Sequence, residues 1–565
     1  MIVSTQLPLD LPASFSDDAY AYGARASGEA HGVVLTRRHV AEFMLDLAGY
    51  SADRDLTTLR LLEPACGVGA FLVPAVERLL ASAKRASRDV ASLHGAIRAF
   101  DIDDAHVVAS REAVRATLKA HGVSEGVAHD LASRWVTRGD FLLAPMSSDI
   151  DVVIGNPPYV RIEQVAPLLQ AEYRRRYSTL FDRADLYVAF IERSLTLLGP
   201  GGVLCFVCAD RWVLNRYGAP LRAMINASFR VNWYIDLHSA SPFESEVIAY
   251  PSIFSLSPGR GGPVLVGRMR SASPEECDEF RAAWRAEGAS TVDVESYHSW
   301  FEGDAPWVLS SSEHLAVLRH LESSNHPLEA DGQTRVGIGV ATGCDEVFVV
   351  GESTDIEPDR LVPLAMRADI HEGRVHDSGR RVINTFSDEG GVVDLAKYPR
   401  LARHLRAHGA KVRQRHVARR NPAAWYRTID RVYPALVATP KLLIPDIAGS
   451  NEVAYDPGRF HPHHNLYFVT STAWDLEVLG ALLSSRVALF FVWSYAVKMR
   501  GGYLRFQAQY LRRIHVPRPS CIPVEVNDGL RDAFRRRDFR AIDALALRAF
   551  NLPSLPDFDF VDTRR

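Results

Sequence analysis

Two consecutive prolines, Pro157 and Pro158, restrict the fold of this chain more than any other local feature. They follow the short apolar run Val152–Ile154, with Gly155 and Asn156 between. Proline fixes φ and has no N–H donor, so a central strand cannot continue through two of them. The sequence therefore predicts a buried strand that ends in a rigid Asn-Pro-Pro-Tyr elbow. Ligands of open α/β sheets bind at the carboxyl ends of the strands, and we expect this elbow to lie in a functional site.

A second segment, Leu61–Leu72, has the pattern of an apolar strand, a glycine turn and a helix. Gly67 and Gly69 let the backbone pass close to a ligand, and the helix start offers free N–H groups. The third glycine of a dinucleotide fingerprint is missing, and the next acid at a strand end, Asp101, follows Gly67 by 34 residues instead of about 20. Asp101 can still bind ribose hydroxyls, with Asp103 as the alternative.

Short apolar runs alternate with amphipathic segments between residues 31 and 256. This alternation predicts a parallel sheet with crossover helices. The break Ser257–Pro263 is rich in proline and glycine and indicates a domain boundary. We therefore expect an amino-terminal arm (1–30), a first domain (31–256) and a second domain (257–565). The expected strands are Leu59–Glu63, Ile97–Asp101, Val152–Ile154 and Gly202–Cys208, and the expected helices are Ala70–Ala83, Asp104–Ala120 and Asp185–Leu198.

Composition limits the compartment and the partners. Six cysteines in 565 residues indicate a reducing environment. Cys205 and Cys208 form a CxxC, but positions three apart on a strand face opposite sides, so we expect core residues rather than metal ligands. No basic and apolar leader and no apolar stretch of about 18 residues stands out, which predicts a cytoplasmic protein without a membrane span. With 65 Lys plus Arg against 68 Asp plus Glu, any nucleic-acid surface must be a local concentration of charge.

The elbow suits the methylation of an amino group on an aromatic ring. Such a nitrogen is a poor nucleophile because its lone pair is delocalised. It needs acceptors for its protons and a fixed line of attack, so positioning does most of the work. The Asn156 side-chain oxygen and the Pro157 carbonyl can supply the acceptors, and Tyr159 can stack on the ring. The alternative is a proline-rich turn without chemistry.

These motifs together resemble the γ-class DNA amino-methyltransferases, the TaqI-like adenine methylases of restriction–modification systems. The resemblance implies a class I S-adenosylmethionine-dependent methyltransferase fold, an α/β domain with a doubly wound, mostly parallel seven-stranded sheet. It also implies a carboxyl-terminal α+β domain that recognises double-stranded DNA, with S-adenosylmethionine as the cofactor. The matching segments occur in the family's order: Leu35–Met44, Glu63–Phe71, Gly139–Leu142, Asn156–Tyr159 and Leu186–Phe190.

The resemblance also implies roles for single residues. Asp140 would accept the amino group of the cofactor's adenine, with Phe141 packed on its ring and Phe190 lining the pocket. Tyr217 would stack on an extruded target base opposite Tyr159, which recovers part of the cost of rotating the base out of the duplex. Asn rather than Ser at the start of the tetrapeptide favours adenine over cytosine. The residues expected at the cofactor are Thr36, Glu63, Ala65, Gly67, Gly69, Asp101, Asp140, Phe141, Asn156 and Phe190.

The second half carries a concentrated basic stretch. Arg400–Arg427 contains nine Lys or Arg residues and no Asp or Glu, a pattern suited to DNA phosphates or to guanine edges. A solvated helix face balanced by acids elsewhere is the alternative. Val336–Gly343 and Gly501–Phe506 also resemble recurring pieces of TaqI-like recognition domains. The residues expected to bind DNA are Arg413, Arg415, Arg419, Arg420, Lys498, Arg500 and Arg505.

Three clustered histidines, His461, His463 and His464, have no cysteine or carboxylate pair at ligand spacing. We therefore expect a loop and no metal site.

Other functions remain open at this stage. The same tetrapeptide occurs in enzymes that methylate RNA or protein glutamine, and a non-catalytic DNA-binding specificity module is a further alternative. A fused nuclease would need roughly 150 more residues and a carboxylate–lysine metal site. We therefore expect a methylase without cleavage activity that acts as a monomer, is associated with the nucleoid of a prokaryote, and has a separately encoded cognate restriction endonuclease.

Overall fold

The computed structural model describes residues 34–245, 250–285, 293–297, 300–448, 452–495, 504–505 and 507–558. The chain divides into two compact units, Met1–Val308 and Leu309–Arg565. The sequence analysis placed its boundary earlier, at residues 256 and 257. The difference arises because two strands beyond that point, β8 (Val264–Arg268) and β9 (Val294–Tyr297), continue the sheet of the first unit.

The first unit is built on a nine-stranded sheet in the order β3-β2-β1-β4-β5-β7-β6-β8-β9. Neighbouring strands from β3 to β5 are parallel, and β7 is antiparallel to both β5 and β6. This is the doubly wound, mostly parallel sheet that was expected, with β8 and β9 added at one edge to the expected seven strands. The other strands are β1 (Leu61–Glu63), β2 (Ile97–Asp101), β3 (Val136–Arg138), β4 (Ile150–Gly155), β5 (Leu198–Ala209), β6 (Phe229–Asp236) and β7 (Pro251–Pro258).

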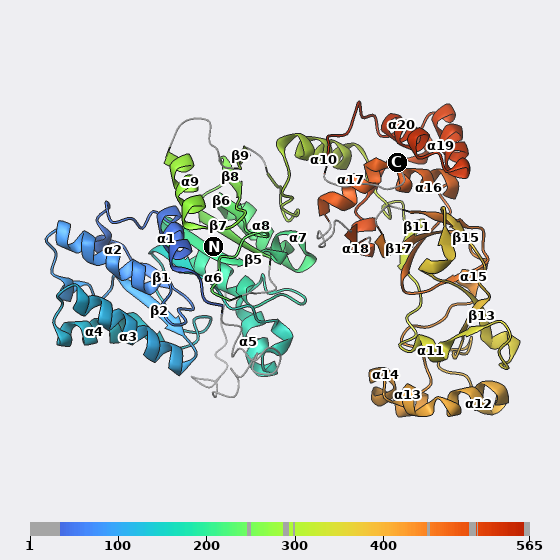
Figure 1. Ribbon diagram of the computed structural model, residues 1–565, viewed down its shortest axis with the longest axis horizontal. Coiled ribbons are helices and arrows are strands. Elements are labelled where there is room, and N and C mark those ends of the chain that lie inside the picture. The colour runs from blue at the N-terminus through green and yellow to red at the C-terminus, as the bar shows by residue number, and fades with distance from the viewer. Residues whose placement is uncertain are drawn as a thin grey trace, which may run out of the picture. The chain divides into compact units, whose positions relative to one another are not determined.

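Helices cover this sheet, and alternate strand residues face separate layers of the core (Figure 1). Cys205 and Val207 of β5 join the apolar core formed with α1 (Arg38–Leu47), α2 (Leu72–Arg85), α3 (Asp104–Ala120), α4 (Glu125–Trp135) and α9 (Pro274–Arg285). Phe206, on the opposite side of β5, meets Phe254 edge to face, and Phe254 meets Trp212. Cys205 and Cys208 are both buried core residues, as their spacing predicted. The remaining helices are α5 (Pro167–Arg176), α6 (Tyr187–Leu197), α7 (Arg211–Leu214) and α8 (Ala219–Ser228).

The second unit is an α+β structure with two main sheets. Six strands form the order β11-β21-β17-β19-β15-β14 and four form β12-β16-β13-β20. These strands are β11 (Thr334–Ile338), β12 (Val349–Gly351), β13 (Leu361–Ala365), β14 (Ile370–His371), β15 (Arg374–Val375), β16 (Arg380–Ile383), β17 (Lys441–Pro445), β19 (Ala454–Asp456), β20 (His461–Pro462) and β21 (Leu466–Ser471). Two small pairs join β10 (His326–Pro327) to β23 (His515–Val516) and β18 (Ile447–Ala448) to β22 (Leu504–Arg505).

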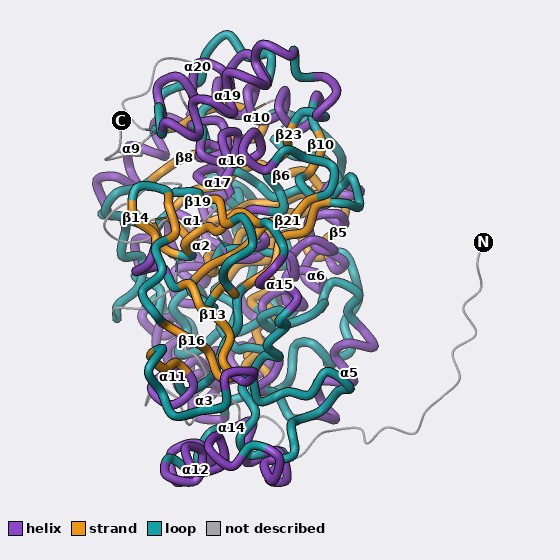
Figure 2. The backbone as a smooth tube through the Cα atoms, turned by 90° about the vertical axis from the view of Figure 1, so that its right-hand side faces the viewer, coloured by secondary structure: helices purple, strands orange, loops and turns teal. Residues whose placement is uncertain are grey.

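Helices lie at the two ends of this unit, as Figures 1 and 2 show from two directions. At one end α16 (Leu476–Ser484), α19 (Val524–Arg536) and α20 (Phe539–Ala549) pack together. At the other lie α12 (Pro399–Ala407), α13 (Gly409–Arg413) and α14 (His416–Arg420), which carry the basic stretch. The remaining helices are α10 (Ser312–Ser324), α11 (Asp345–Phe348), α15 (Ala435–Ala438), α17 (Arg486–Tyr495) and α18 (Ala508–Leu511).

Within the described residues, no single helix is long and apolar enough to cross a membrane; only α16 and α17 taken together, bent by 59°, meet the length and composition of a span.

Candidate active site

A cavity opens at the carboxyl ends of the parallel strands of the first unit. Its wall combines the loops after β1, β2, β3 and β4 with Val34–Thr36 and one side chain each of α3 and α6. Nine of the ten residues expected at the cofactor line it, although they come from segments up to 154 residues apart: Thr36, Glu63, Ala65, Gly67, Asp101, Asp140, Phe141, Asn156 and Phe190. Gly69 lies outside this lining, although it is only two residues after Gly67 in the same turn.

The loop after β1 is fastened to the end of β2 by main-chain and side-chain bonds. The Cys66 N–H donates to the Phe100 carbonyl at 2.8 Å, and the Gly67 N–H donates to Asp101 Oδ2 at 2.8 Å. Ser110 Oγ of α3 donates to the Gly67 carbonyl at 2.7 Å. Gly67 has a φ of +51°, and a Cβ added there would meet no described atom within 4 Å. Glycine thus permits this turn and leaves space in the cavity for a ligand.

The two candidate acids at the end of β2 make different contacts. Asp103 caps α3, since its Oδ1 accepts from the N–H of Ala105 at 2.8 Å and of His106 at 3.4 Å. Asp101 lines the cavity, and its Oδ1 lies 3.4 Å from His106 Nδ1, a contact that raises the pKa of His106. His106 also lines the cavity and was not anticipated. The sequence offered one signal for His106, which is its position in the first helical turn after the acidic end of the strand.

Glu63 is almost fully buried, at 1% exposure, and its Oε2 has no hydrogen-bond partner in the described part of the chain. Burial, and then the charge of Asp101, raise the pKa of Glu63 well above its ordinary value. A positively charged ligand would relieve this cost by providing a partner for the carboxylate. Glu63, Asp101 and Asp140 all line the cavity, which makes it suited to a cation.

One side of the cavity offers flat apolar surface beside an acceptor. Phe141 and Phe190 pack with ring centroids 5.4 Å apart, and the Arg193 guanidinium lies 4.9 Å from the Phe141 centroid. Asp140 is held by the Leu142 N–H at 2.8 Å and the Tyr173 hydroxyl at 2.7 Å. A nucleobase with an exocyclic amino group fits this combination of ring stacking and hydrogen-bond acceptance.

Asn156 is held by one end of its amide and open at the other. Its Nδ2 donates to the Val34 carbonyl at 2.9 Å and lies 3.5 Å from Thr36 Oγ1. Its Oδ1 is buried and lacks a hydrogen-bond partner among the described residues. Because the Val34 carbonyl can only accept a hydrogen bond, the amide nitrogen of Asn156 must face Val34. Oδ1 is therefore free to accept a hydrogen bond from a ligand.

The segment that orients Asn156 is itself anchored. The Arg37 N–H donates to the Pro242 carbonyl at 3.0 Å, and the Glu244 N–H donates to the Leu35 carbonyl at 2.9 Å. The Asn-Pro-Pro-Tyr elbow, the residues before α1 and the loop after β6 are therefore linked by hydrogen bonds.

Tyr159 and Tyr217 do not line the cofactor cavity but meet at a third tyrosine. Tyr187 OH and Tyr217 OH are 2.6 Å apart, and the rings of Tyr159 and Tyr187 meet edge to face with centroids 6.3 Å apart. Phe243 contacts Tyr159 in the same way at 6.4 Å. Tyr187 and Phe243 were not anticipated. Tyr187 lies in the same motif as Phe190, and its place in that motif was the signal that the sequence offered.

In the basic stretch, several cations are paired within the second unit. Arg400 and Arg403 lie 3.4 and 3.0 Å from the carboxylate of Asp355, and Lys411 pairs with Glu346. Arg415 is half-buried and donates to the carbonyls of Val412, Thr342, Trp425 and Arg427 at 2.7 to 3.0 Å. Its guanidinium is thus used to hold the local fold together.

Three other cations of this stretch are exposed to solvent. Arg413, Arg419 and Arg420 are exposed, and Arg413 lies over the Trp425 ring at 3.9 Å from the centroid. Lys498 and Arg500 lie outside the described residues. Arg505 is described only through its backbone, which pairs with Ile447 in the β18–β22 ladder.

Two family models match this chain: the Eco57I restriction-modification methylase over residues 128–243 and the TaqI-like C-terminal specificity domain over residues 397–516. The type II methyltransferase M.PaeR7I of Pseudomonas aeruginosa is 46% identical over 531 residues, covering 93% of this chain and 92% of its own length. M.XhoI of Xanthomonas vasicola is 42% identical over 534 residues, covering 93% and 98%. Among solved structures, the type IIL restriction-modification enzyme MmeI in complex with DNA has the same fold, with a TM-score of 0.59 over 92% of this chain and 73% of that one at 11% identity.

Proposed function

The chain belongs to the type II methyltransferases of restriction–modification systems, and from this premise we propose that it methylates the N6 amino group of adenine within a specific sequence of double-stranded DNA. Membership makes it a DNA methyltransferase with a class I methyltransferase fold and S-adenosylmethionine as its cofactor. The sequence left open the methylation of RNA, the methylation of a protein glutamine and DNA binding without catalysis. None of these is the function of this family.

The amide of Asn156 is the observation that carries the proposal. Its Oδ1 is buried and unpartnered within the described chain, while the Val34 carbonyl holds its nitrogen. An acceptor fixed in this way can take a hydrogen bond from an exocyclic amino group and direct the lone pair of that nitrogen along one line. The Pro157 carbonyl would accept the second proton. Asparagine at this position, rather than the serine common in cytosine amino-methyltransferases, favours adenine.

The cavity residues would hold the cofactor according to their chemistry. S-adenosylmethionine supplies a reactive methyl group on a positively charged sulfur. Asp101 would accept from the ribose hydroxyls, Asp140 from the adenine amino group, and Phe141 and Phe190 would pack on the adenine ring. Glu63 would face the cationic methionine end, beside the turn that contains Ala65, Gly67 and Gly69, with Thr36 across the cavity.

The target base must leave the duplex to reach this site, because a stacked amino group is inaccessible. Tyr159 and Tyr217 would stack on the extruded base, and stacking of this kind is worth roughly 1–3 kcal/mol per base. Tyr187 would keep the two tyrosines in register through its contacts with both.

The second unit would read the DNA sequence. Arg413, Arg419 and Arg420 would contact phosphates, together with Lys498, Arg500 and Arg505 from the segment around β22. Arg415 would act indirectly, by holding α13 and α14 in place. We propose that the enzyme acts as a monomer in the cytoplasm, and that it protects host DNA from a separately encoded cognate restriction endonuclease.

Analysis of the methylated nucleoside tests this proposal. Unmethylated plasmid DNA is incubated with the full chain and S-adenosylmethionine carrying a labelled methyl group, then digested to nucleosides and separated by mass. We expect the label in N6-methyl-2′-deoxyadenosine. Label in N4-methylcytosine would overturn the adenine assignment while leaving the family assignment intact.

A further inference from the structure

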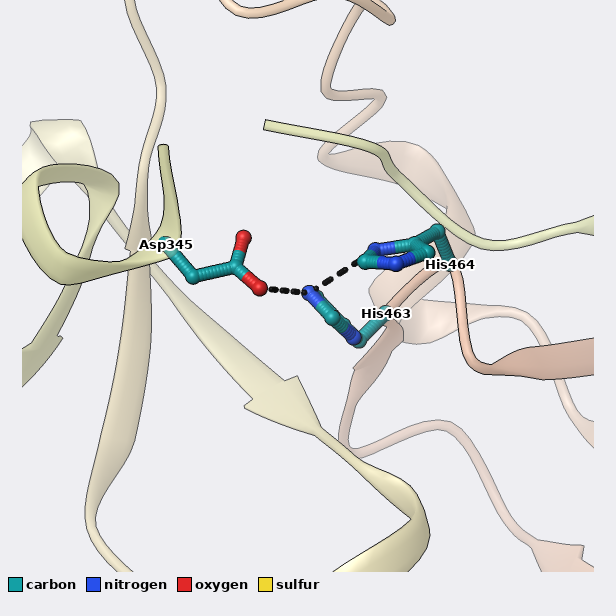
Figure 3. Close-up of side chains that lie close together, drawn as sticks. All are labelled: Asp345, His463 and His464. Atoms are coloured by element: carbon teal, nitrogen blue, oxygen red, sulfur yellow. Dashed lines mark hydrogen bonds and ion pairs between the residues drawn. The ribbon is translucent and has the colours of Figure 1, made fainter. Parts of the chain in front are cut away.

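The fold of the second unit brings a carboxylate to two adjacent histidines. His463 and His464 follow β20, and Asp345 opens α11 far earlier in the chain. His463 Nε2 lies 3.0 Å from Asp345 Oδ2 and 3.0 Å from His464 Nδ1 (Figure 3). All three atoms lie within 4.8 Å of one another. No metal site was expected from the sequence because no cysteine or carboxylate pair stands at ligand spacing from the histidines, but the tertiary structure brings Asp345 to them.

Main-chain bonds hold the two segments together. The Val340 N–H donates to the Pro462 carbonyl at 2.9 Å, and the His464 N–H donates to the Val340 carbonyl at 3.0 Å. Thr342 Oγ1 donates to Asp345 Oδ1, which orients the carboxylate from behind. Such outer contacts are characteristic of residues that bind metal ions, since they fix the direction of each donor atom before the ion arrives.

The three donor atoms compete for too few protons. His463 Nε2 faces both Asp345 Oδ2 and His464 Nδ1, yet a ring nitrogen carries at most one hydrogen. A single cation would serve all three atoms at once. Two imidazoles and one carboxylate are a donor set for zinc and neighbouring divalent transition metals. Bonds of 2.0–2.1 Å in a tetrahedral site separate the donor atoms by about 3.3 Å, so the two contacts of 3.0 Å would have to lengthen only slightly.

We propose that Asp345, His463 and His464 bind a divalent transition-metal ion such as Zn²⁺ through Oδ2, Nε2 and Nδ1. The side chain of His464 is exposed, so the ion can enter from solvent and keep a water ligand. The proton on His463 Nε2 must move to Nδ1, which is buried without a partner among the described residues. Moving this proton costs free energy that opposes metal binding, and we therefore expect a micromolar rather than a nanomolar dissociation constant for the ion.

The ion would be structural. It joins the loop 340–345 to the loop 463–464, and Thr342 of the first loop accepts from Arg415 Nη1 at 2.8 Å. Arg415 in turn lies between α13 and α14. The ion therefore stabilises the support of the exposed basic helices, and this inference does not depend on which base the enzyme methylates.

The proposal is tested by measuring how the full, untagged chain binds Co²⁺ and Zn²⁺ after a chelator has removed any bound metal. We expect one Co²⁺ per chain with visible absorption bands of a low-coordinate site, displacement by Zn²⁺, and a melting temperature several degrees higher with Zn²⁺ than without. His464→Ala should remove the bands and the temperature shift, and Asp345→Asn should weaken both.

His416→Ala is the matched control, because this exposed histidine of α14 lies outside the cluster, and it should bind Co²⁺ like the parent chain. The proposal fails if the parent chain takes up no Co²⁺ at millimolar concentration. It also fails if His464→Ala binds with unchanged stoichiometry and affinity.

Discussion

The two units of the molecule differ in how their polar side chains are satisfied. In the first unit, Asn156 Oδ1 and Glu63 Oε2 are buried, face one cavity region and lack described partners. In the second, the densest cluster of positive charge is partly neutralised from within, and Arg415 donates to four main-chain carbonyls. These two unpaired acceptors at the cavity thus indicate where a ligand would complete the first unit. In the second unit, the capacity to bind DNA phosphates depends on the exposed cations without an acidic partner rather than on the total number of cations.

The largest expected effect follows from removing the open acceptor. Asn156→Ala should lower kcat by about a hundredfold to a thousandfold, the range seen when one positioned polar group is lost from an active site. Single-turnover methylation at saturating DNA and cofactor measures it. Asn232→Ala is the control, because Asn232 belongs to the same sheet but bonds to Ser255 and Ser257 instead of facing the cavity. Equal rates in both variants would end the distinction drawn for Asn156.

The two acids at the end of β2 allow a sharper comparison within the first unit. Asp101→Ala should weaken S-adenosylmethionine binding by at least tenfold, because it removes both a cavity acceptor and the bond to the Gly67 N–H. Asp103→Ala should leave that affinity nearly unchanged and lower the free energy of unfolding by about 1 kcal/mol, the cost of losing a helix cap. Calorimetric titration and thermal melting separate the two. A cofactor defect in Asp103→Ala alone would reverse the assignment.

In the second unit, Arg415 and Arg413 should behave differently although they are two residues apart. Arg415→Ala should lower the free energy of unfolding by about 2–3 kcal/mol, because it leaves buried carbonyls without donors. Arg413→Ala should lower the free energy of unfolding by no more than about 1 kcal/mol, the cost of losing its contact with the Trp425 ring, and should reduce the salt dependence of DNA binding by about one counterion. Urea unfolding and DNA titrations at several salt concentrations measure these effects. If Arg413→Ala unfolds easily and Arg415→Ala does not, the division between supporting and contacting arginines is wrong.

The smallest effect is expected from a single hydroxyl. Tyr187→Phe keeps the ring that contacts Tyr159 and removes the hydrogen bond to Tyr217 OH. We expect a several-fold rise in KM for DNA with a smaller change in kcat, consistent with one hydrogen bond worth about 1 kcal/mol. Fluorescence of 2-aminopurine at the target position should report less extrusion. Normal extrusion in this variant would mean that Tyr187 does not position Tyr217.

Local patterns predicted much of the first unit. The strand Ile97–Asp101 and the helix Asp104–Ala120 have the bounds that periodicity gave, because apolar spacing reports which face of an element is buried. Nine of the ten residues expected at the cofactor line one cavity because parallel strands place the loops after them at a common edge.

Contacts between distant segments could not be predicted in this way. The Val34 carbonyl that orients Asn156 is a backbone atom, and no residue type marks it. Asp345 meets His463 across 118 residues. Arg415 looks like its exposed neighbours in the sequence, and only tertiary packing gives it four carbonyl partners. The strands β8 and β9 were missed because the break at residues 257–263 suggested that the sheet had ended.

The link between Val34 and Asn156 also determines which kinds of genetic change the enzyme can tolerate. Every amino acid, proline included, carries a carbonyl, so substitutions at residue 34 preserve the atom that orients the catalytic amide. Removing one residue between Val34 and Thr36 would instead shift that carbonyl along the chain and away from Asn156. Natural variation should therefore allow other apolar residues at position 34, whose side chain packs on the core, but should keep the length of this loop fixed. Point-mutation scanning alone would not reveal the constraint on length.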